Sequence, residues 1–114
     1  KMPSGEYVSP DFVENYIKRS AYIENVFVYS KNGVLEAIVI PDPIKAEGLN
    51  NELLHQTIEQ EIEVNYNKRV HEGQKVKRFA LVNDTWSPMS GELTPTMKVK
   101  RHVLEEKYKA IIER

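Results

Sequence analysis

The chain has 114 residues and a mass of 13.2 kDa, the size of one domain with a single hydrophobic core. Hydrophobic residues make up 40% and charged residues 29%, which excludes a disordered chain, and 16 basic against 17 acidic side chains give no global field that would attract nucleic acid or an anionic membrane. The absence of cysteine excludes disulfides, thiolate metal sites and cysteine nucleophiles.

The start of the chain and its hydropathy bear on targeting. No apolar run approaches the roughly 20 residues that a membrane-spanning helix needs, and the first residues, Lys1-Met2-Pro3-Ser4-Gly5, do not form a signal peptide. A natural chain begins with methionine, so the lysine at the first position indicates a fragment cut from a larger protein. The lack of cysteine is consistent with a reducing cytoplasm, which is the expected location.

The first predicted helix runs from Pro10 to about Arg19. Ser9 suits the N-cap and Pro10 the first helical position, and a turn with a very short strand at 5–8 precedes them. One face of this helix is apolar, and we expect it to be buried in the core. That face consists of Phe12, Val13, Tyr16 and Ile17.

A β-hairpin is predicted next. Residues 23–29 alternate between apolar and polar side chains, residues 34–40 are nearly all apolar, and Asn32-Gly33 between them is a strong signal for a hairpin turn. The second strand alternates too little for a strand with one solvated face, so we expect it to lie centrally in a sheet with both faces covered. Pro41-Asp42-Pro43 ends this strand.

A second helix is predicted from about Asn51 to Glu72. Its apolar residues recur at every fourth position, a period longer than the roughly 3.6 residues of a helical turn. The apolar stripe therefore drifts around the helix axis, and a bend or an early end near Asn65 is expected. The stripe consists of Leu54, Ile58, Ile62, Tyr66 and Val70.

Residues 76–82 are typical of a third main strand, and the apolar residues at 103–112 predict a terminal helix. Between these elements the chain has no periodicity from Asn83 to Lys100. The expected fold class is α+β, with a small sheet of about three main strands, the hairpin plus a third strand, packed with helices in one domain that spans 1–114.

Several kinds of catalytic and binding site can be set aside. No phosphate-binding glycine loop, nucleophile elbow or paired metal-binding histidine motif occurs. The histidines have no second histidine or carboxylate at ligand spacing, so we expect no metal site and three surface histidines: His55, His71 and His102. A complete active site is not encoded in this chain.

The strand at 77–82, Lys77-Arg78-Phe79-Ala80-Leu81-Val82, bears a faint likeness to the basic-aromatic strand of an RNA-recognition sheet. It lacks the glycine and the second aromatic residue of that motif. A strand with a basic entrance and apolar residues that face a core is the favoured interpretation, and no nucleic-acid partner is expected.

The aperiodic segment 86–101 is unusually long for so small a domain, which favours a functional role. It contains Trp86 and Met97, which a solvated linker would not need. Hydroxyl groups lie next to basic side chains at its end, a grouping that suits a polyanion such as a nucleotide phosphate. The residues concerned are Thr94, Thr96, Lys98, Lys100 and Arg101. On residue types alone, a basic shoulder at the start of the last helix remains an equal alternative.

This segment resembles the closing part of long-chain fatty acid–CoA ligases, members of the adenylate-forming superfamily. The matching stretches are Trp86-Ser87-Pro88, Gly91-Glu92-Leu93-Thr94-Pro95-Thr96-Met97-Lys98-Val99-Lys100-Arg101 and Lys107-Tyr108, with Gly5-Glu6-Tyr7-Val8-Ser9-Pro10, Val13-Glu14-Asn15 and Val39-Ile40-Pro41-Asp42 towards the other end. The resemblance is weakest from Pro43 to Gly73. It implies that the chain is the C-terminal domain, a mobile lid, and that a large N-terminal domain for ATP and the acyl group lies outside it.

The resemblance also implies a two-step reaction. A carboxylate attacks the α-phosphate of ATP to give an acyl-adenylate and diphosphate, and the thiol of CoA then displaces AMP. Lys98 matches the family's catalytic lysine, which contacts the carboxylate and the α-phosphate during adenylation. Many members carry Ser-Gly before that lysine, whereas this sequence has Thr96-Met97, a departure shared by the long-chain branch.

Other roles are implied with less specificity. Thr94, Thr96 and Lys100 are candidates for contact with the nucleotide phosphates. Gly5 and Tyr7 are candidates for the CoA pantetheine channel, with a plain turn as the alternative for Gly5, and Lys1 lies near the interdomain hinge.

The resemblance implies partners as well. They are ATP with Mg²⁺, held mainly by the absent large domain, together with CoA and a fatty acid, and the chain itself supplies no metal ligand. The covalently linked N-terminal adenylation domain is the protein partner, and any membrane association of the whole enzyme is expected to be peripheral. The fragment alone should have no ligase activity. The alternatives are the lid of another adenylate former, for an acyl–carrier-protein, medium-chain or aryl substrate, or a non-catalytic interaction module.

Overall fold

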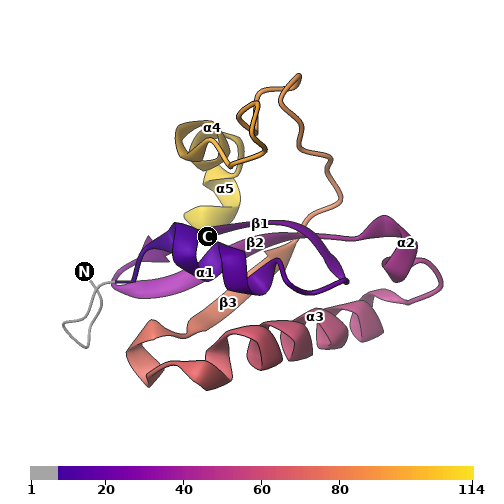
Figure 1. The fold of residues 1–114 in the computed structure, drawn as a ribbon, viewed down its shortest axis with the longest axis vertical. Coiled ribbons are helices and arrows are strands. Elements are labelled where there is room, and N and C mark those ends of the chain that lie inside the picture. Colours follow the sequence, from indigo (N-terminus) through magenta and orange to yellow (C-terminus); the bar gives the residue numbers. More distant parts are fainter. Residues whose placement is uncertain (1–7) are drawn as a thin grey trace. The chain divides into compact units, whose positions relative to one another are not determined.

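A three-stranded sheet in the order β1-β2-β3 is the framework of the first part of the chain (Figure 1). The structure is a computed structural model that describes residues 8–114, and the chain divides into two compact units, 1–83 and 84–114. The hairpin of β1 (Ile23–Lys31) and β2 (Val34–Pro41) is antiparallel, and β3 (Val76–Leu81) pairs with β2 in parallel. The predicted central position of the second strand is confirmed.

The turn between β1 and β2 explains why the hairpin was predictable. Asn32 and Gly33 have φ angles of 55° and 79°. A two-residue hairpin turn of this kind needs positive φ at both positions, which asparagine and glycine adopt at low cost. Every residue of β2 from Leu35 to Ile40 is buried, as expected of a strand with cover on both faces.

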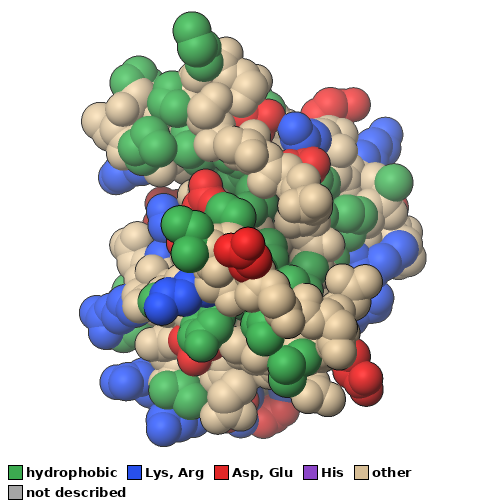
Figure 2. Space-filling model, turned by 90° about the vertical axis from the view of Figure 1, so that its right-hand side faces the viewer, with side chains coloured by type: hydrophobic (Ala, Val, Ile, Leu, Met, Phe, Trp, Pro, Cys, Tyr) green, Lys and Arg blue, Asp and Glu red, His purple; other side chains and the backbone are tan. Residues whose placement is uncertain are grey.

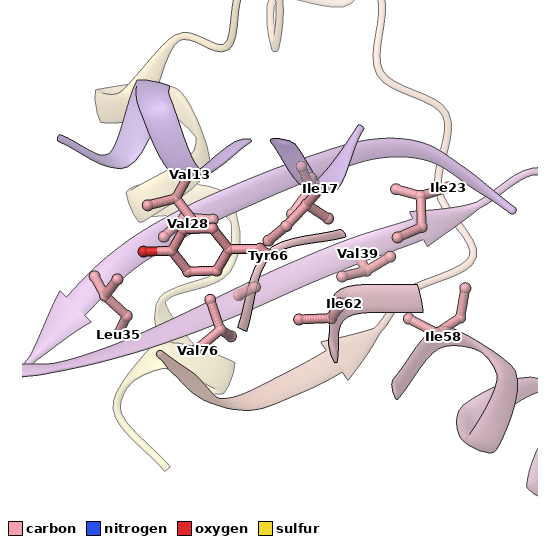
Figure 3. Packing of buried hydrophobic residues seen from close by; sticks show 12 residues of the cluster. Val13, Ile17, Ile23, Val28, Leu35, Val39, Ile58, Ile62, Tyr66 and Val76 are labelled. Atoms are coloured by element: carbon pink, nitrogen blue, oxygen red, sulfur yellow. The ribbon is translucent and has the colours of Figure 1, made fainter. Parts of the chain in front are cut away.

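Two helices of the first unit pack on one face of the sheet (Figure 3). They are α1 (Pro10–Ile17), which starts at the predicted proline, and α3 (Asn51–Asn65). The core between the helices and the strands consists of Val13, Ile17, Ile23, Val26, Val28, Leu35, Ala37, Val39, Ile58, Ile62, Tyr66 and Val76. Of the four apolar residues expected in the core from the first helix, Val13 and Ile17 are fully buried, whereas Phe12 is 50% exposed.

A buried carboxylate ties α1 to the sheet. Glu14 is 6% exposed, and its Oε2 accepts a hydrogen bond of 2.7 Å from the backbone N–H of Val28 in β1. Among residues 8–114, β1 is an edge strand of the sheet, so no strand of this part of the chain pairs with it on that side. The side chain of Glu14 therefore satisfies one edge group of the sheet and fixes the position of the helix.

The second predicted helix ends early, at Asn65, as its drifting stripe suggested, so the predicted extension to Glu72 is wrong. Tyr66 leaves the helical conformation, and its buried hydroxyl donates to the carbonyl of Gln74 at 2.7 Å. The side chain of Asn67 bonds both the N–H and the carbonyl of Val76, at 2.9 and 3.0 Å. These bonds hold the start of β3 against the end of α3. They can form only if the chain leaves the helix and reverses direction after Asn65.

Short helical turns complete the connection between β2 and β3. The sequence did not predict α2 (Pro43–Ala46), whose Asp42 cap accepts from the N–H groups of Ile44 and Lys45. Two 3₁₀ turns follow α3, η1 (Asn67–Arg69) and η2 (Glu72–Gln74).

The second unit contains α4 (Arg101–Lys107) and α5 (Lys109–Ile112) after a long loop. The single terminal helix that was predicted is thus interrupted at Tyr108, whose φ and ψ are -110° and 25°. The ring of Tyr108 is buried and its hydroxyl is held by other side chains of the unit. Within residues 8–114, no helix has the length and apolar character needed to cross a membrane.

The packing of α3 predicts a clear difference between two of its residues. Ile58 is fully buried, whereas Leu53 is 45% exposed on the same helix. Ile58→Ala should lower the free energy of unfolding by about 2–5 kcal/mol, because it removes buried methyl groups and leaves a cavity. Leu53→Ala should lower it by less than about 1 kcal/mol. Urea unfolding of the two variants measures the difference, and equal losses would contradict this packing.

Candidate functional site

A tight turn near the end of the long loop carries Lys98. Leu93 and Val99 form an antiparallel bridge, and the N–H of Lys100 donates to the carbonyl of Glu92 at 2.8 Å. We call residues 92–100 the Lys98 hairpin. At its tip the N–H of Thr94 donates to the carbonyl of Lys98 at 2.7 Å. The segment that the sequence left without secondary structure is therefore closed by backbone hydrogen bonds.

The structure brings together three of the predicted site residues at this tip. The N–H of Lys98 donates to the Thr94 hydroxyl at 3.1 Å, and the hydroxyls of Thr94 and Thr96 lie 3.1 Å apart. Thr94 thus helps to build the turn, while the side chain of Thr96 is exposed beside it. Lys100 lies at the base of the hairpin instead of its tip.

The side chain of Lys98 is exposed. Within residues 8–114, the ammonium groups of Lys98 and Lys100 take part in no ion pair or side-chain hydrogen bond. An ammonium group in this state is solvated and can be offered to an anion without first breaking a contact inside this part of the chain.

Met97 precedes the lysine in an unusual backbone conformation. Its φ is 69°, in the left-handed region that glycine adopts readily and that costs other residues roughly 1–2 kcal/mol. The side chain of Met97 is 53% exposed, so burial does not offset this cost. Glycine would adopt this conformation without that cost, whereas this chain forms the turn with methionine.

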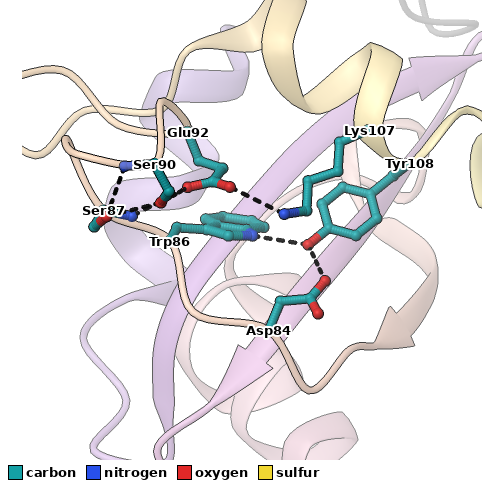
Figure 4. A network of polar contacts seen from close by, with 7 residues as sticks. All are labelled: Asp84, Trp86, Ser87, Ser90, Glu92, Lys107 and Tyr108. Atoms are coloured by element: carbon teal, nitrogen blue, oxygen red, sulfur yellow. Dashed lines mark hydrogen bonds and ion pairs between the residues drawn. The ribbon is translucent and has the colours of Figure 1, made fainter.

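The first residue of the hairpin, Glu92, has a buried carboxylate that joins a network of polar contacts (Figure 4). Glu92 is only 4% exposed, and one of its oxygens accepts from the N–H of Ser87 at 3.2 Å and from the Ser90 hydroxyl. The other oxygen accepts from the ammonium of Lys107 in α4 at 2.9 Å. The hydrogen bond from Ser90 and that from Lys107 lower the pKa of Glu92 to about 2, so the group is ionised at neutral pH.

A second set of hydrogen bonds links the start of the unit to its end (Figure 4). The indole N–H of Trp86 donates to the Tyr108 hydroxyl at 2.8 Å, and that hydroxyl donates to Asp84 at 2.5 Å. Burial and the bond to Asp84 raise the pKa of Tyr108 far above its ordinary value. The phenol therefore stays protonated and keeps its role as a donor.

The sequence assigned no role to the members of these two networks, which are Asp84, Ser87, Ser90, Glu92, Lys107 and Tyr108. Trp86 was the one residue singled out, because a solvated linker would not need it, and its burial explains its presence. Glu92 and Lys107 are 15 residues apart and Trp86 and Tyr108 are 22 apart, separations at which no local pattern reveals a contact.

The remaining predicted site residues lie at the start of the chain, and the histidines lie at its surface. Lys1, Gly5 and Tyr7 lie outside the described residues. All three histidines are exposed, as expected, with the ring of His55 stacked on Phe79 at 4.5 Å. The described part of the chain contains no cluster of three histidines or carboxylates that could hold a metal ion.

The nucleic-acid alternative for β3 gains no support. Arg78 lies 4.0 Å from the carboxylate of Glu36, and Phe79 packs against the core on the other face of the sheet. On the surface drawn in Figure 2, basic side chains lie in several separate places among acidic and apolar ones. This arrangement agrees with the favoured interpretation of a strand with a basic entrance and an apolar core face.

Backbone strain at Met97 predicts an unusual order of stabilities. Glycine normally destabilises a folded chain relative to alanine by roughly 0.5–1 kcal/mol, but where φ is positive the order is reversed. Met97→Gly should therefore be more stable than Met97→Ala by roughly 1 kcal/mol. Urea unfolding monitored by Trp86, the only tryptophan, measures this difference. A less stable glycine variant would show that the left-handed turn does not form.

The lowered pKa of Glu92 predicts how stability depends on pH. Its pKa in the folded state, about 2, lies below the ordinary value of 4.5. The stabilisation by ionised Glu92 is therefore fully present above about pH 4.5 and is lost as the pH falls towards 2. Urea unfolding followed by Trp86 fluorescence should show that Glu92→Gln and the parent chain differ at neutral pH, and that the difference shrinks below about pH 4.5 and disappears as the pH approaches 2. A difference that stays constant with pH would contradict this assignment.

Comparison with known proteins identifies the family. The model of the AMP-binding enzyme C-terminal domain matches residues 2–114. Human long-chain-fatty-acid–CoA ligase 6 is 31% identical over an alignment that covers 99% of this chain and 19% of that protein. Fatty acyl-CoA synthetase A of Dictyostelium discoideum is 29% identical over 99% of this chain and 20% of its own length. The chain spans about a fifth of the length of these relatives.

Solved structures agree on the fold. The adenylation domain of a carboxylate reductase from Mycobacterium chelonae superposes with a TM-score of 0.85 and 22% identity, over 99% of this chain and 18% of that one. An acyl-CoA synthetase from Brucella canis gives a TM-score of 0.61 and 16% identity over 95% of this chain and 18% of that one. The predicted α+β class, a small sheet of three strands with packed helices, is confirmed. The chain belongs to the family of AMP-binding enzyme C-terminal domains.

Proposed function

We propose that this chain is the mobile C-terminal domain of an AMP-forming long-chain fatty acid–CoA ligase. The whole enzyme would convert ATP, a fatty acid and CoA into acyl-CoA, AMP and diphosphate. The observation that carries the proposal is an exposed lysine, Lys98, at the tip of a closed hairpin in a chain of this family. The covalently linked N-terminal adenylation domain would be the partner into which the hairpin reaches.

Lys98 would act in the adenylation step. Negative charge builds up on the phosphoryl oxygens when the carboxylate attacks the α-phosphate, and a fixed ammonium group near those oxygens lowers the energy of the transition state. A donor placed in this way is commonly worth a factor of about 10²–10³ in rate. The short hairpin supports this role because its backbone bonds limit the positions that the base of the lysine side chain can take.

The neighbouring residues would have supporting roles. Thr96 and Lys100 would contact the nucleotide phosphates, and Thr94, whose hydroxyl already accepts from the N–H of Lys98, would act mainly by keeping the turn closed. Gly5 and Tyr7 would line the CoA pantetheine channel, and Lys1 would lie near the hinge between the domains.

The substrates are part of the same proposal. Relatives close to 30% identical over nearly the whole chain are long-chain-fatty-acid–CoA ligases, which supports a long-chain fatty acid as the acyl substrate. The acyl pocket, the adenine pocket and the ligands of the Mg²⁺ that accompanies ATP would all lie in the N-terminal domain. The isolated 114-residue chain would accordingly have no ligase activity.

A single substitution tests the catalytic role of Lys98. In the full-length ligase, Lys98→Ala should reduce fatty-acid-dependent exchange between ATP and diphosphate by about 10²–10³ fold, because the adenylation transition state loses its ammonium group. The second step, thioester formation from preformed acyl-adenylate, should survive.

Lys109→Ala is the matched control, since Lys109 is also exposed in the second unit but lies in α5, outside the hairpin. It should leave both steps unchanged. If Lys98→Ala leaves both steps intact, the hairpin is only structural and the chain acts as an interaction module. Exchange measured with medium-chain and aryl acids compares these substrates with long-chain fatty acids, and a preference for either would replace the long-chain assignment.

A further inference from the structure

The Lys98 hairpin depends for its orientation on residues outside its tip. Its own closure rests on the bridge between Leu93 and Val99 and on the bond from the N–H of Lys100 to the carbonyl of Glu92. These contacts define the shape of the hairpin but do not fix it against the rest of the unit. Besides the buried side chain of Leu93 and the bond from its N–H to the carbonyl of Ser87 at 3.3 Å, a further contact holds the base of the hairpin in place.

Glu92 provides that contact because both sides of the hairpin meet at this residue. Its backbone carbonyl accepts the hydrogen bond from the N–H of Lys100 on the other side of the hairpin, and its side chain is buried within the unit. There one carboxylate oxygen accepts from the N–H of Ser87 and from the Ser90 hydroxyl. The same residue therefore joins the hairpin to the loop that precedes it.

The other carboxylate oxygen connects the hairpin to α4. Lys107 donates to it at 2.9 Å and is the one cation paired with this carboxylate in the described residues. The side chain of Glu92 is 6% exposed and that of Lys107 is 36% exposed, so the pair is only partly screened by water. Removing Lys107 leaves the buried carboxylate of Glu92 without its cation, a charge that the surroundings compensate poorly.

The helix that supplies Lys107 is itself anchored. Leu104, one turn earlier in α4, is fully buried. Tyr108, the next residue, is held by Trp86 and Asp84 through its hydroxyl. The ammonium group of Lys107 is thus presented from a fixed backbone, and the ion pair transmits that fixed position to the base of the hairpin.

We infer that Glu92 and Lys107 are positioning residues, which hold the hairpin so that Lys98 reaches the reacting phosphate in a reproducible orientation. The inference rests on the proposed catalytic role of Lys98. Neither residue needs to touch substrate, because a displacement of about 1 Å at the reacting group can cost 10²-fold in rate. Loss of the pair should therefore slow adenylation and spare the thioester-forming step, in which Lys98 has no proposed part.

The test uses the full-length ligase with four substitutions. Glu92→Gln and Lys107→Met each remove one charge of the pair at nearly unchanged volume, and Lys107→Arg retains the cation. The control is Glu36→Gln, which alters another buried carboxylate, one that accepts a hydrogen bond from Tyr29 in the sheet of the first unit. Two rates are measured for each variant, the maximal rate of ATP–diphosphate exchange and the rate of thioester formation from preformed acyl-adenylate. Trp86 fluorescence of the 114-residue chain with the same substitutions, in which it is the only tryptophan, reports at neutral pH whether the second unit is folded.

The expected result is a fall of roughly 10–100 fold in the exchange rate for Glu92→Gln and for Lys107→Met, with thioester formation within about twofold of the parent. The double variant that combines Glu92→Gln with Lys107→Met should be no slower than the slower of the two single variants, because both substitutions break the same contact. Lys107→Arg should recover most of the exchange rate, and Glu36→Gln should leave both rates within about twofold.

Two results would overturn the inference. In one, exchange is unchanged in Glu92→Gln and in Lys107→Met while Lys98→Ala abolishes it, which refutes the positioning role and leaves the proposed function intact. In the other, both rates fall together in Lys107→Met. This result would identify the pair as a general stability element, because the site of Lys107 is partly exposed and tolerates change more readily than that of Glu92. An exchange rate that does not respond to Lys98→Ala would refute the proposed function itself.

Discussion

A carboxylate with almost no solvent contact must find its hydrogen bonds inside the protein, and Glu92 finds them in a backbone N–H, a hydroxyl and an ammonium group from separate parts of the second unit. This requirement helps to organise the unit, together with the burial of Trp86, Leu93, Leu104 and Tyr108. The loop before the hairpin, the hairpin itself and α4 have no shared strand or long helix to align them. The bond from the N–H of Leu93 to the carbonyl of Ser87 joins the loop to the hairpin, and each of the three segments also supplies or carries a partner of the same buried charge.

The first unit relies mainly on apolar burial, with Glu14 in a similar supporting role. Val13 and Ile17 of α1 pack on the sheet, and Glu14 between them turns to the edge of β1 and accepts from a backbone N–H. In both units a buried carboxylate serves the backbone of a neighbouring segment instead of acting as an acid or a base. Charged groups of this kind add orientation to a fold whose stability comes from the packed side chains.

The tip of the hairpin, in contrast, contains features that do not stabilise the fold. Met97 carries a positive φ and an exposed apolar side chain, and the ammonium group of Lys98 beside it has no ion-pair or hydrogen-bond partner among the described residues. The strain at Met97 costs stability and the unpaired ammonium group contributes none, and both lie at or beside the lysine that the proposed function uses. Strain and unpaired charge collected at one point are what a preorganised functional site requires, provided that the surrounding contacts hold the backbone in place. In this unit the networks of Glu92 and Tyr108 provide those contacts.

Much of the chain was predictable because local rules governed it. The Asn32-Gly33 turn, the continuous apolar run of β2 and the proline at the start of α1 each express a preference of a few neighbouring residues, and the three-strand α+β class followed from them. The grouping of Thr94, Thr96 and Lys98 was visible for the same reason, since these residues are close in sequence. Tertiary structure decided the end of α3, where Asn67 bonds Val76, and the break at Tyr108, whose hydroxyl bonds Trp86 and Asp84. It also decided the pairing of Glu92 with Lys107, because a hydrogen bond between residues 15 positions apart depends on how the intervening chain folds back and leaves no periodic trace in the sequence.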